Sequence, residues 1–73
     1  MKVGDRVKLI YDGRPLAWVA YYGEGIITKI TPSGLLRIVG KTGSCDRNEL
    51  FDPYTGFAKG WNTLWFEEIG GNP

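Results

Sequence analysis

The chain has 73 residues, of which 42% are hydrophobic and 23% are charged, and its net charge is +1. That length suits one domain, and the composition is too apolar for a disordered chain. The balanced charge lacks the electrostatic footprint of a strong nucleic-acid binder, and the single cysteine, Cys45, excludes an internal disulfide and a thiolate metal site within one chain.

The first predicted strand covers Arg6–Tyr11, where bulky and polar side chains alternate. The residues that share one face of this strand are Val7, Leu9 and Tyr11. Segment 16–22 is apolar or aromatic on both faces, so its period does not indicate which side is buried. The glycines of Gly23-Glu24-Gly25 predict a flexible bend before the next strand.

Two clear strands follow at 26–31 and 35–39, joined by Pro32-Ser33-Gly34. A two-residue turn would place Ile30 opposite Arg37. We prefer a three-residue loop with Gly34 in the left-handed conformation, because it sets Ile30 opposite Leu36 and Thr28 opposite Ile38 on one apolar face. The predicted core consists of Val7, Leu9, Ile26, Ile30, Leu36, Ile38 and Phe66.

The second half of the chain predicts two further elements. Residues 45–51 could form a short strand or a single helical turn, residues 52–56 form a turn, and residues 64–69 form a last strand before a flexible tail at 70–73. We therefore expect a single all-β domain at 1–69. Five short strands favour a small five-stranded barrel with short 3-10 or helical turns, because closure removes exposed edges.

Two segments resemble known small barrels. Val3-Gly4-Asp5-Arg6-Val7 and Gly25-Ile26-Ile27-Thr28-Lys29-Ile30 look like the opening of SH3-like barrels, including the Tudor and KOW groups. Phe51-Asp52-Pro53-Tyr54-Thr55-Gly56 before a terminal strand is similar to small barrel proteins encoded by phages and other mobile elements. The resemblance implies an SH3-like fold, which supports no single function because such barrels have many unrelated roles.

Several kinds of chemistry are absent from the sequence. The chain has no histidine, the commonest general base and metal ligand, and it has no glycine-rich phosphate loop. The carboxylates of Asp46, Glu49 and Asp52 match no calcium-loop spacing, and acidic residues at such positions usually cap turns. We therefore expect no enzyme activity, no cofactor and no metal.

The aromatic residues are the first candidate binding surface. The candidates for a protein contact are Trp18, Tyr21, Tyr22, Tyr54 and Trp61. In Tudor-like barrels such residues form a cage for methylated lysine or arginine, and aromatic side chains beside basic ones also stack on single-stranded bases. Most aromatics of a small barrel belong to its core, but both faces of segment 16–22 cannot point inward. At least one of Trp18, Tyr21 and Tyr22 should therefore be partly exposed or cover a barrel end.

The basic residues are the second candidate surface. The preferred register places Lys29 opposite Arg37 on the outer face, where two like charges favour an anionic partner. The residues that could extend this patch are Lys8, Lys41 and Arg47. Alternatively, these side chains extend into solvent or are neutralised by Glu67 or Glu68.

Two functions remain open at this point. The leading hypothesis is a non-catalytic module that binds nucleic acid or nucleoprotein. The alternative is a protein-interaction module, host-directed or self-associating, that uses an exposed aromatic patch. We expect a cytoplasmic location, because a secreted domain of this size usually carries disulfides, and no membrane contact, because the longest apolar stretch, 16–22, is too short to span a bilayer.

Overall fold

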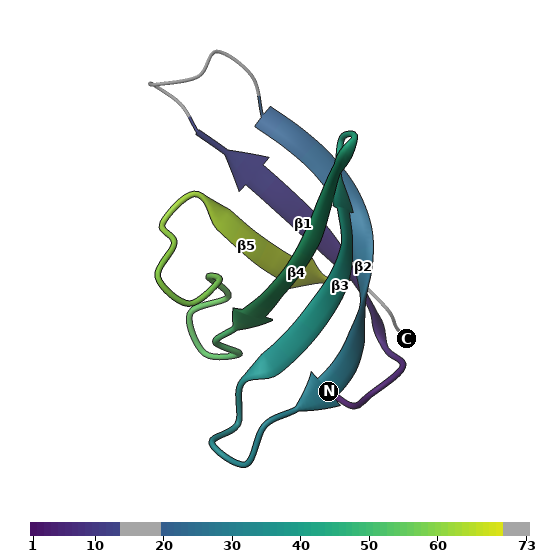
Figure 1. The fold of residues 1–73 in the computed structure, drawn as a ribbon, viewed down its shortest axis with the longest axis vertical. Helices are drawn as coiled ribbons and strands as arrows, with labels where there is room; N and C mark the ends of the chain where they lie inside the picture. Colours follow the sequence, from purple (N-terminus) through teal and green to yellow (C-terminus); the bar gives the residue numbers. More distant parts are fainter. Residues whose placement is uncertain (14–19, 70–73) are drawn as a thin grey trace.

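The computed structural model describes residues 1–13 and 20–69. This part of the chain is all-β, as predicted, and its strands are β1 (Arg6–Asp12), β2 (Ala20–Ile30), β3 (Leu36–Thr42), β4 (Cys45–Phe51) and β5 (Leu64–Glu68). All neighbours are antiparallel and the order is β4-β3-β2-β1-β5, so β1 lies between β2 and β5 (Figure 1). The described residues contain none of the short helical turns that we expected, and no helix among them could cross a membrane.

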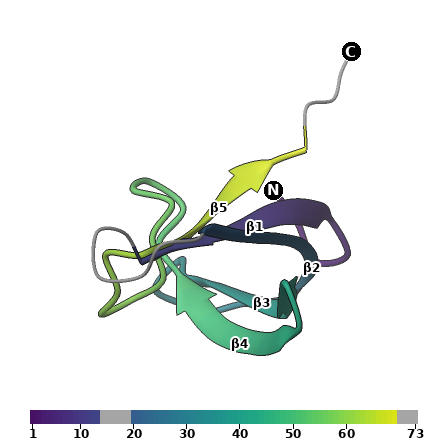
Figure 2. The ribbon, with the colours of Figure 1, turned by 90° about the horizontal axis from the view of Figure 1, so that it is seen from above.

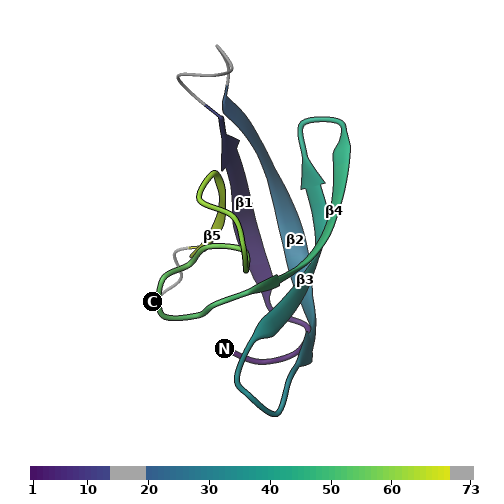
Figure 3. The ribbon, with the colours of Figure 1, turned by 60° about the vertical axis from the view of Figure 1, so that its left-hand side comes forward.

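Strand β2 is longer than predicted, because Gly23–Gly25 lies inside it and does not form a separate bend. Gly25 pairs with Gly40 of β3, where the backbone of β2 leaves no room for a Cβ on Gly40. A Cβ added to Gly40 would lie 2.1 Å from the carbonyl oxygen of Glu24. Glycine is therefore required for this close approach. It allows β2 to pair with β1 on one side and with β3 on the other in the curled sheet (Figures 2 and 3).

The turn between β2 and β3 has the predicted conformation. The backbone N–H of Thr31 donates to the carbonyl oxygen of Leu35 over 2.8 Å, and Gly34 has a φ of 92°. Ile30 lies opposite Leu36, as expected from the three-residue loop. This part of the register prediction is confirmed.

The predicted pairing of Thr28 with Ile38 is wrong. The register shifts between Ile27 and Lys29, and Ile27 is the residue opposite Ile38. Thr28 is thus the extra residue of a β-bulge, which changes which side chains of β2 point inward. Simple alternation could not reveal this extra residue.

The core confirms five of the seven predicted residues and corrects two. Ile26 is 47% exposed on the outer face, opposite Val39, and Ile30 is 40% exposed at the end of the sheet. Ile27 is buried instead, because the bulge turns it inward. The buried cluster consists of Val7, Leu9, Ile27, Leu36, Ile38, Phe51, Ala58, Leu64 and Phe66.

Residues 56–59 connect the two ends of the strand order. The N–H of Lys59 donates to Leu50 of β4, and the N–H of Phe66 in β5 donates to the carbonyl oxygen of Gly56. Isolated bridges at Ala58 and Phe57 reinforce this link. Beyond it β4 and β5 do not pair within the described residues, so the sheet is barrel-like without full closure.

Candidate binding surface

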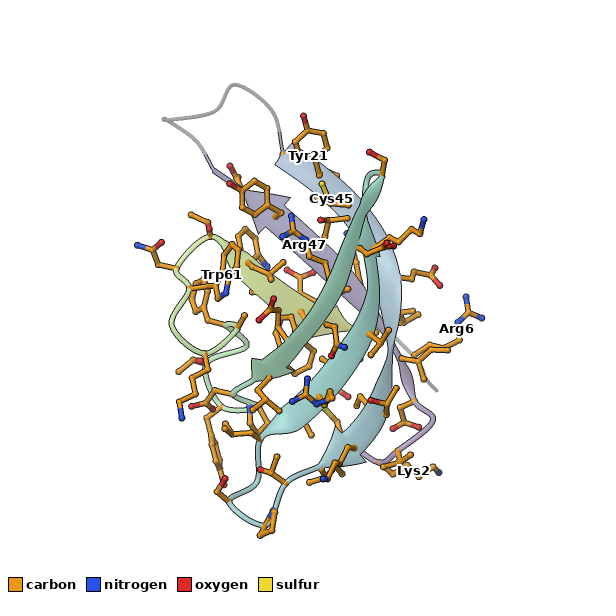
Figure 4. The ribbon with its side chains drawn as sticks, viewed as in Figure 1. Lys2, Arg6, Tyr21, Cys45, Arg47 and Trp61 are labelled. Atoms are coloured by element: carbon orange, nitrogen blue, oxygen red, sulfur yellow. The ribbon has the colours of Figure 1, made fainter. Side chains whose placement is uncertain are left out.

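Four side chains from four parts of the chain meet on the inner side of the sheet, near the end where β1 stops and β2 begins. We define the aromatic–arginine cluster as Tyr11, Tyr21, Arg47 and Trp61. The Tyr11 ring stacks on Tyr21 with centroids 6.4 Å apart and packs edge-on against Trp61 at the same distance. Figure 4 shows Arg47 reaching from β4 into this group.

Strand alternation places Arg47 in the cluster. Phe51 is fully buried, and positions two and four residues before it, Glu49 and Arg47, face the same side of β4. The Arg47 guanidinium carbon lies 5.0 Å from the centre of the Tyr11 ring and 5.7 Å from that of Trp61, within the range of cation–π attraction. Its Nε donates to Oγ1 of the buried Thr42 over 2.8 Å.

One side of the cluster is packed against the protein, and the other is exposed to solvent. Tyr21 is 44% exposed and Trp61 is 37% exposed, while Tyr11 and Arg47 are half-buried. The prediction that segment 16–22 leaves an aromatic exposed is confirmed by Tyr21 and by Tyr22. Large aromatic faces that are partly open to solvent around a held guanidinium form a ready contact surface.

The remaining aromatic candidates do not join this cluster. Tyr22 lies on the outer face beneath the Lys8 ammonium group, 5.4 Å from its ring centre. Tyr54 is 97% exposed in the turn that follows β4, where Oδ1 of Asp52 accepts the Tyr54 N–H. Trp18 falls outside the described residues.

The cluster also differs from a cage for a methylated cation. In such a cage, the ligand's cation lies against the aromatic faces. Here Arg47 is already placed against Tyr11 and Trp61. A second cation would meet like charge at short range, so this arrangement disfavours methylated lysine and arginine.

The five candidate basic residues do not form one continuous patch. Lys29 and Arg37 are directly opposite, as predicted, and Arg37 donates to Oδ1 of Asn48 over 2.8 Å. Arg47 points to the inner side of the sheet. Lys8 and Lys41 each lie beside carboxylates.

Carboxylates lie beside the remaining two lysines. Lys8 of β1 lies opposite Glu24 of β2 and Glu67 of β5, so it has a carboxylate on each side. The Lys41 ammonium group lies 3.5 Å from Oδ1 of Asp46, directly across the β3–β4 pair. These two lysines therefore add little net positive potential to the outer face.

Within residues 1–13 and 20–69, the acidic and cysteine side chains are not arranged as in a metal site. The described residues contain no group of three or more histidine, cysteine or carboxylate side chains that could hold a metal ion. Asp52 forms a turn through its side chain, as the sequence indicated. Cys45 is exposed near the β3–β4 turn.

Sequence reasoning missed the roles of Tyr11 and Thr42 and placed Arg47 with the outer-face basic residues. One available signal was the alternation of 45–51: if Phe51 points inward, so does Arg47. The contact between Trp61 and Tyr11 had no local signal, because it depends on how 56–59 returns the chain to β5.

Comparisons with known proteins identify no relative of this chain. No protein-family model, curated protein or solved structure matches this chain. The fold defines a small antiparallel β protein, and the function has to be inferred from its surfaces.

Proposed function

We propose that this chain is a non-catalytic binding module of the SH3-like kind, and that the aromatic–arginine cluster binds another protein. The SH3-like part of the proposal is supported by the resemblance of segments 3–7 and 25–30, together with a curled antiparallel sheet of five strands. The single observation that supports the binding site is Arg47 held against Tyr11 and Trp61 beside the exposed ring of Tyr21.

The composition of the cluster favours a protein partner. Tyrosine, tryptophan and arginine are the residues most enriched among those that dominate binding energy at protein interfaces, whereas lysine is depleted there. The cluster is built from only these enriched types. Its rings are packed on one side, so they lose little side-chain entropy when a partner covers the other.

Peptide display tests this proposal with a matched pair of variants. A library of random peptides is selected on the wild-type chain, and the selected peptides are then titrated against Tyr21→Ala and Tyr54→Ala. Both tyrosines are exposed, but only Tyr21 belongs to the cluster. We expect Tyr21→Ala to weaken binding by about tenfold or more, as for an interface hot spot, and Tyr54→Ala to leave it unchanged.

Thermal unfolding of each variant shows whether the domain remains folded. Failure to enrich any peptide, or equal loss of affinity in the two variants, would contradict the proposal. Sedimentation of the chain alone tests whether the partner is a second copy of the chain. Self-association through the cluster would be abolished by Tyr21→Ala.

Nucleic acid is the second candidate, supported by the adjacent Lys29 and Arg37 on the outer face. Phosphate binders gain affinity by releasing several counterions, which requires several unpaired cations. The carboxylates beside Lys8 and Lys41 reduce that number. We therefore place nucleic acid second to a protein partner.

A further inference from the structure

Arg47 is a partly buried cation whose hydrogen-bonding capacity is only partly used. Its Nε is bonded to Thr42, and its plane is held near Tyr11 and Trp61. Within the described part of the chain, its two terminal nitrogens have no hydrogen-bond partner and its charge has no carboxylate in ion-pair contact. Arginine presents its donors as a rigid fork, so these free nitrogens are already oriented.

The neighbouring cations on the same hairpin differ from Arg47. Lys41 has the carboxylate of Asp46, and Arg37 has the amide oxygen of Asn48. Arg6, on β1, is paired with Glu24. Arg47 is thus the cation of β3 and β4 that is partly buried and has no carbonyl or carboxylate acceptor among the described residues.

We infer that the free edge of the Arg47 guanidinium is a carboxylate-binding site, and that the partner presents an acidic group there beside an apolar side chain. This inference rests on the proposed function of the same cluster. Two parallel charge-assisted hydrogen bonds to a carboxylate would satisfy both terminal nitrogens. The exposed faces of Tyr21 and Trp61 would cover the adjacent apolar group.

A carboxylate fits this site better than a phosphate chain. The site offers a single guanidinium, and Glu49 lies on the same face of β4 two residues away. A nucleic-acid backbone would bring several negative charges toward that carboxylate, whereas one carboxylate matches one cation. The source of the carboxylate is either an Asp or Glu side chain or the C-terminus of the partner.

Four peptides of one sequence frame, all with an acetylated N-terminus, distinguish these sources. The first carries Leu-Glu-Leu with an amidated end, the second Leu-Gln-Leu amidated, the third Leu-Gln-Leu with a free terminal carboxylate, and the fourth Leu-phosphoserine-Leu amidated. Binding is followed by NMR on the indole N–H of Trp61 and the Nε–H of Arg47. We expect the Glu peptide, the free-carboxylate peptide or both to bind about tenfold or more tightly than the amidated Gln peptide.

Two substitutions connect this preference to Arg47. Arg47→Gln removes the charge and should abolish the preference for carboxylate, whereas Arg47→Lys keeps a point charge without the fork and should retain only part of it. Lys41→Gln is the control, because Lys41 lies on the same hairpin and is already paired. It should leave the preference intact.

The outcomes separate this inference from the proposed function. Binding of the amidated Gln peptide that equals binding of both carboxylate peptides would overturn the carboxylate site while leaving a peptide-binding cluster. So would a preference that survives Arg47→Gln, or binding of the phosphoserine peptide alone. If none of the four peptides shifts the cluster signals although display-selected peptides do, the carboxylate site is again overturned and the proposed function stands.

Discussion

Arg47 donates through Nε to Oγ1 of Thr42, and the two atoms are 2.8 Å apart. Thr42 is only 1% exposed, so a buried hydroxyl on β3 fixes the direction of a guanidinium on β4. The two residues are on paired strands, and Thr42 itself lies opposite Cys45. This bond ties the candidate ligand-binding group to a buried hydroxyl at the end of β3.

The first prediction concerns a substitution that removes the hydrogen bond between Thr42 and Arg47. Thr42→Val keeps the side-chain shape and should lower the free energy of unfolding by about 1 kcal/mol, the usual contribution of one hydrogen bond. It should also weaken carboxylate-peptide binding several-fold, because the guanidinium loses its fixed orientation. Denaturant unfolding and the NMR titration measure the two effects. Unchanged peptide affinity in Thr42→Val would show that Thr42 does not orient Arg47, and Thr28→Val, on the exposed bulge, is the control.

The second prediction concerns the bulge in β2. Ile27→Ala should cost about 2–5 kcal/mol, because it leaves a cavity in the core, whereas Ile26→Ala should cost less than about 1 kcal/mol. The two residues are neighbours of the same type, but Ile27 is fully buried and Ile26 is 47% exposed. Equilibrium unfolding in urea compares them directly. Equal costs would contradict the observed register.

The third prediction compares two glycines. Gly40→Ala should destabilise the domain by about 3 kcal/mol or more, because the new Cβ would overlap the backbone of Glu24 and Gly25. Gly34→Ala should cost about 1 kcal/mol, since a Cβ there meets no atom within 4 Å and only the φ of 92° is unfavourable. Melting temperatures of the two variants give the order. A smaller loss for Gly40→Ala than for Gly34→Ala would mean that β2 and β3 are not so close.

The fourth prediction addresses the outer-face basic pair. Lys29→Ala and Arg37→Ala should leave peptide binding unchanged, because neither residue belongs to the cluster. Fluorescence titration with single- and double-stranded DNA and RNA should show only weak binding at about 50 mM salt that disappears by about 200 mM. A complex that persists at the higher salt, and whose salt dependence falls by about one contact in Lys29→Ala, would favour the nucleic-acid candidate.

The fold was predictable where local signals and pairing signals agreed. Alternation in 6–11 and the turn chemistry of Gly34 correctly identified a strand, a loop and the pairing of Lys29 with Arg37. The errors at Ile26 and Thr28 share one cause, the bulge, which adds a residue that no local pattern marks. The merging of two predicted segments into β2 has another cause, since glycines that usually mark a bend here permit close strand contact.

The candidate site was predictable in its residue types but not in its assembly. Tyr21, Trp61 and Arg47 were all named as candidates, yet in different groups. Their meeting depends on the β-sheet curvature and on the return of residues 56–59, both of which are long-range features. Tyr11 connects them, and its inward position was evident from the alternation of the first strand alone.

The position of β1 between β2 and β5 has a consequence for how the molecule acquires its structure. β1 is synthesised before the other four strands, but one of its two edges stays unpaired until β5 is synthesised. This is because Leu9 of β1 pairs with Phe66 of β5. Until then, the β1–β4 meander has unpaired backbone edges at β1 and at β4 and an uncovered apolar face, and such intermediates associate with other chains. Closure of β1 by β5 should therefore govern both the folding rate and the yield of soluble protein, and local hairpin formation should be fast by comparison.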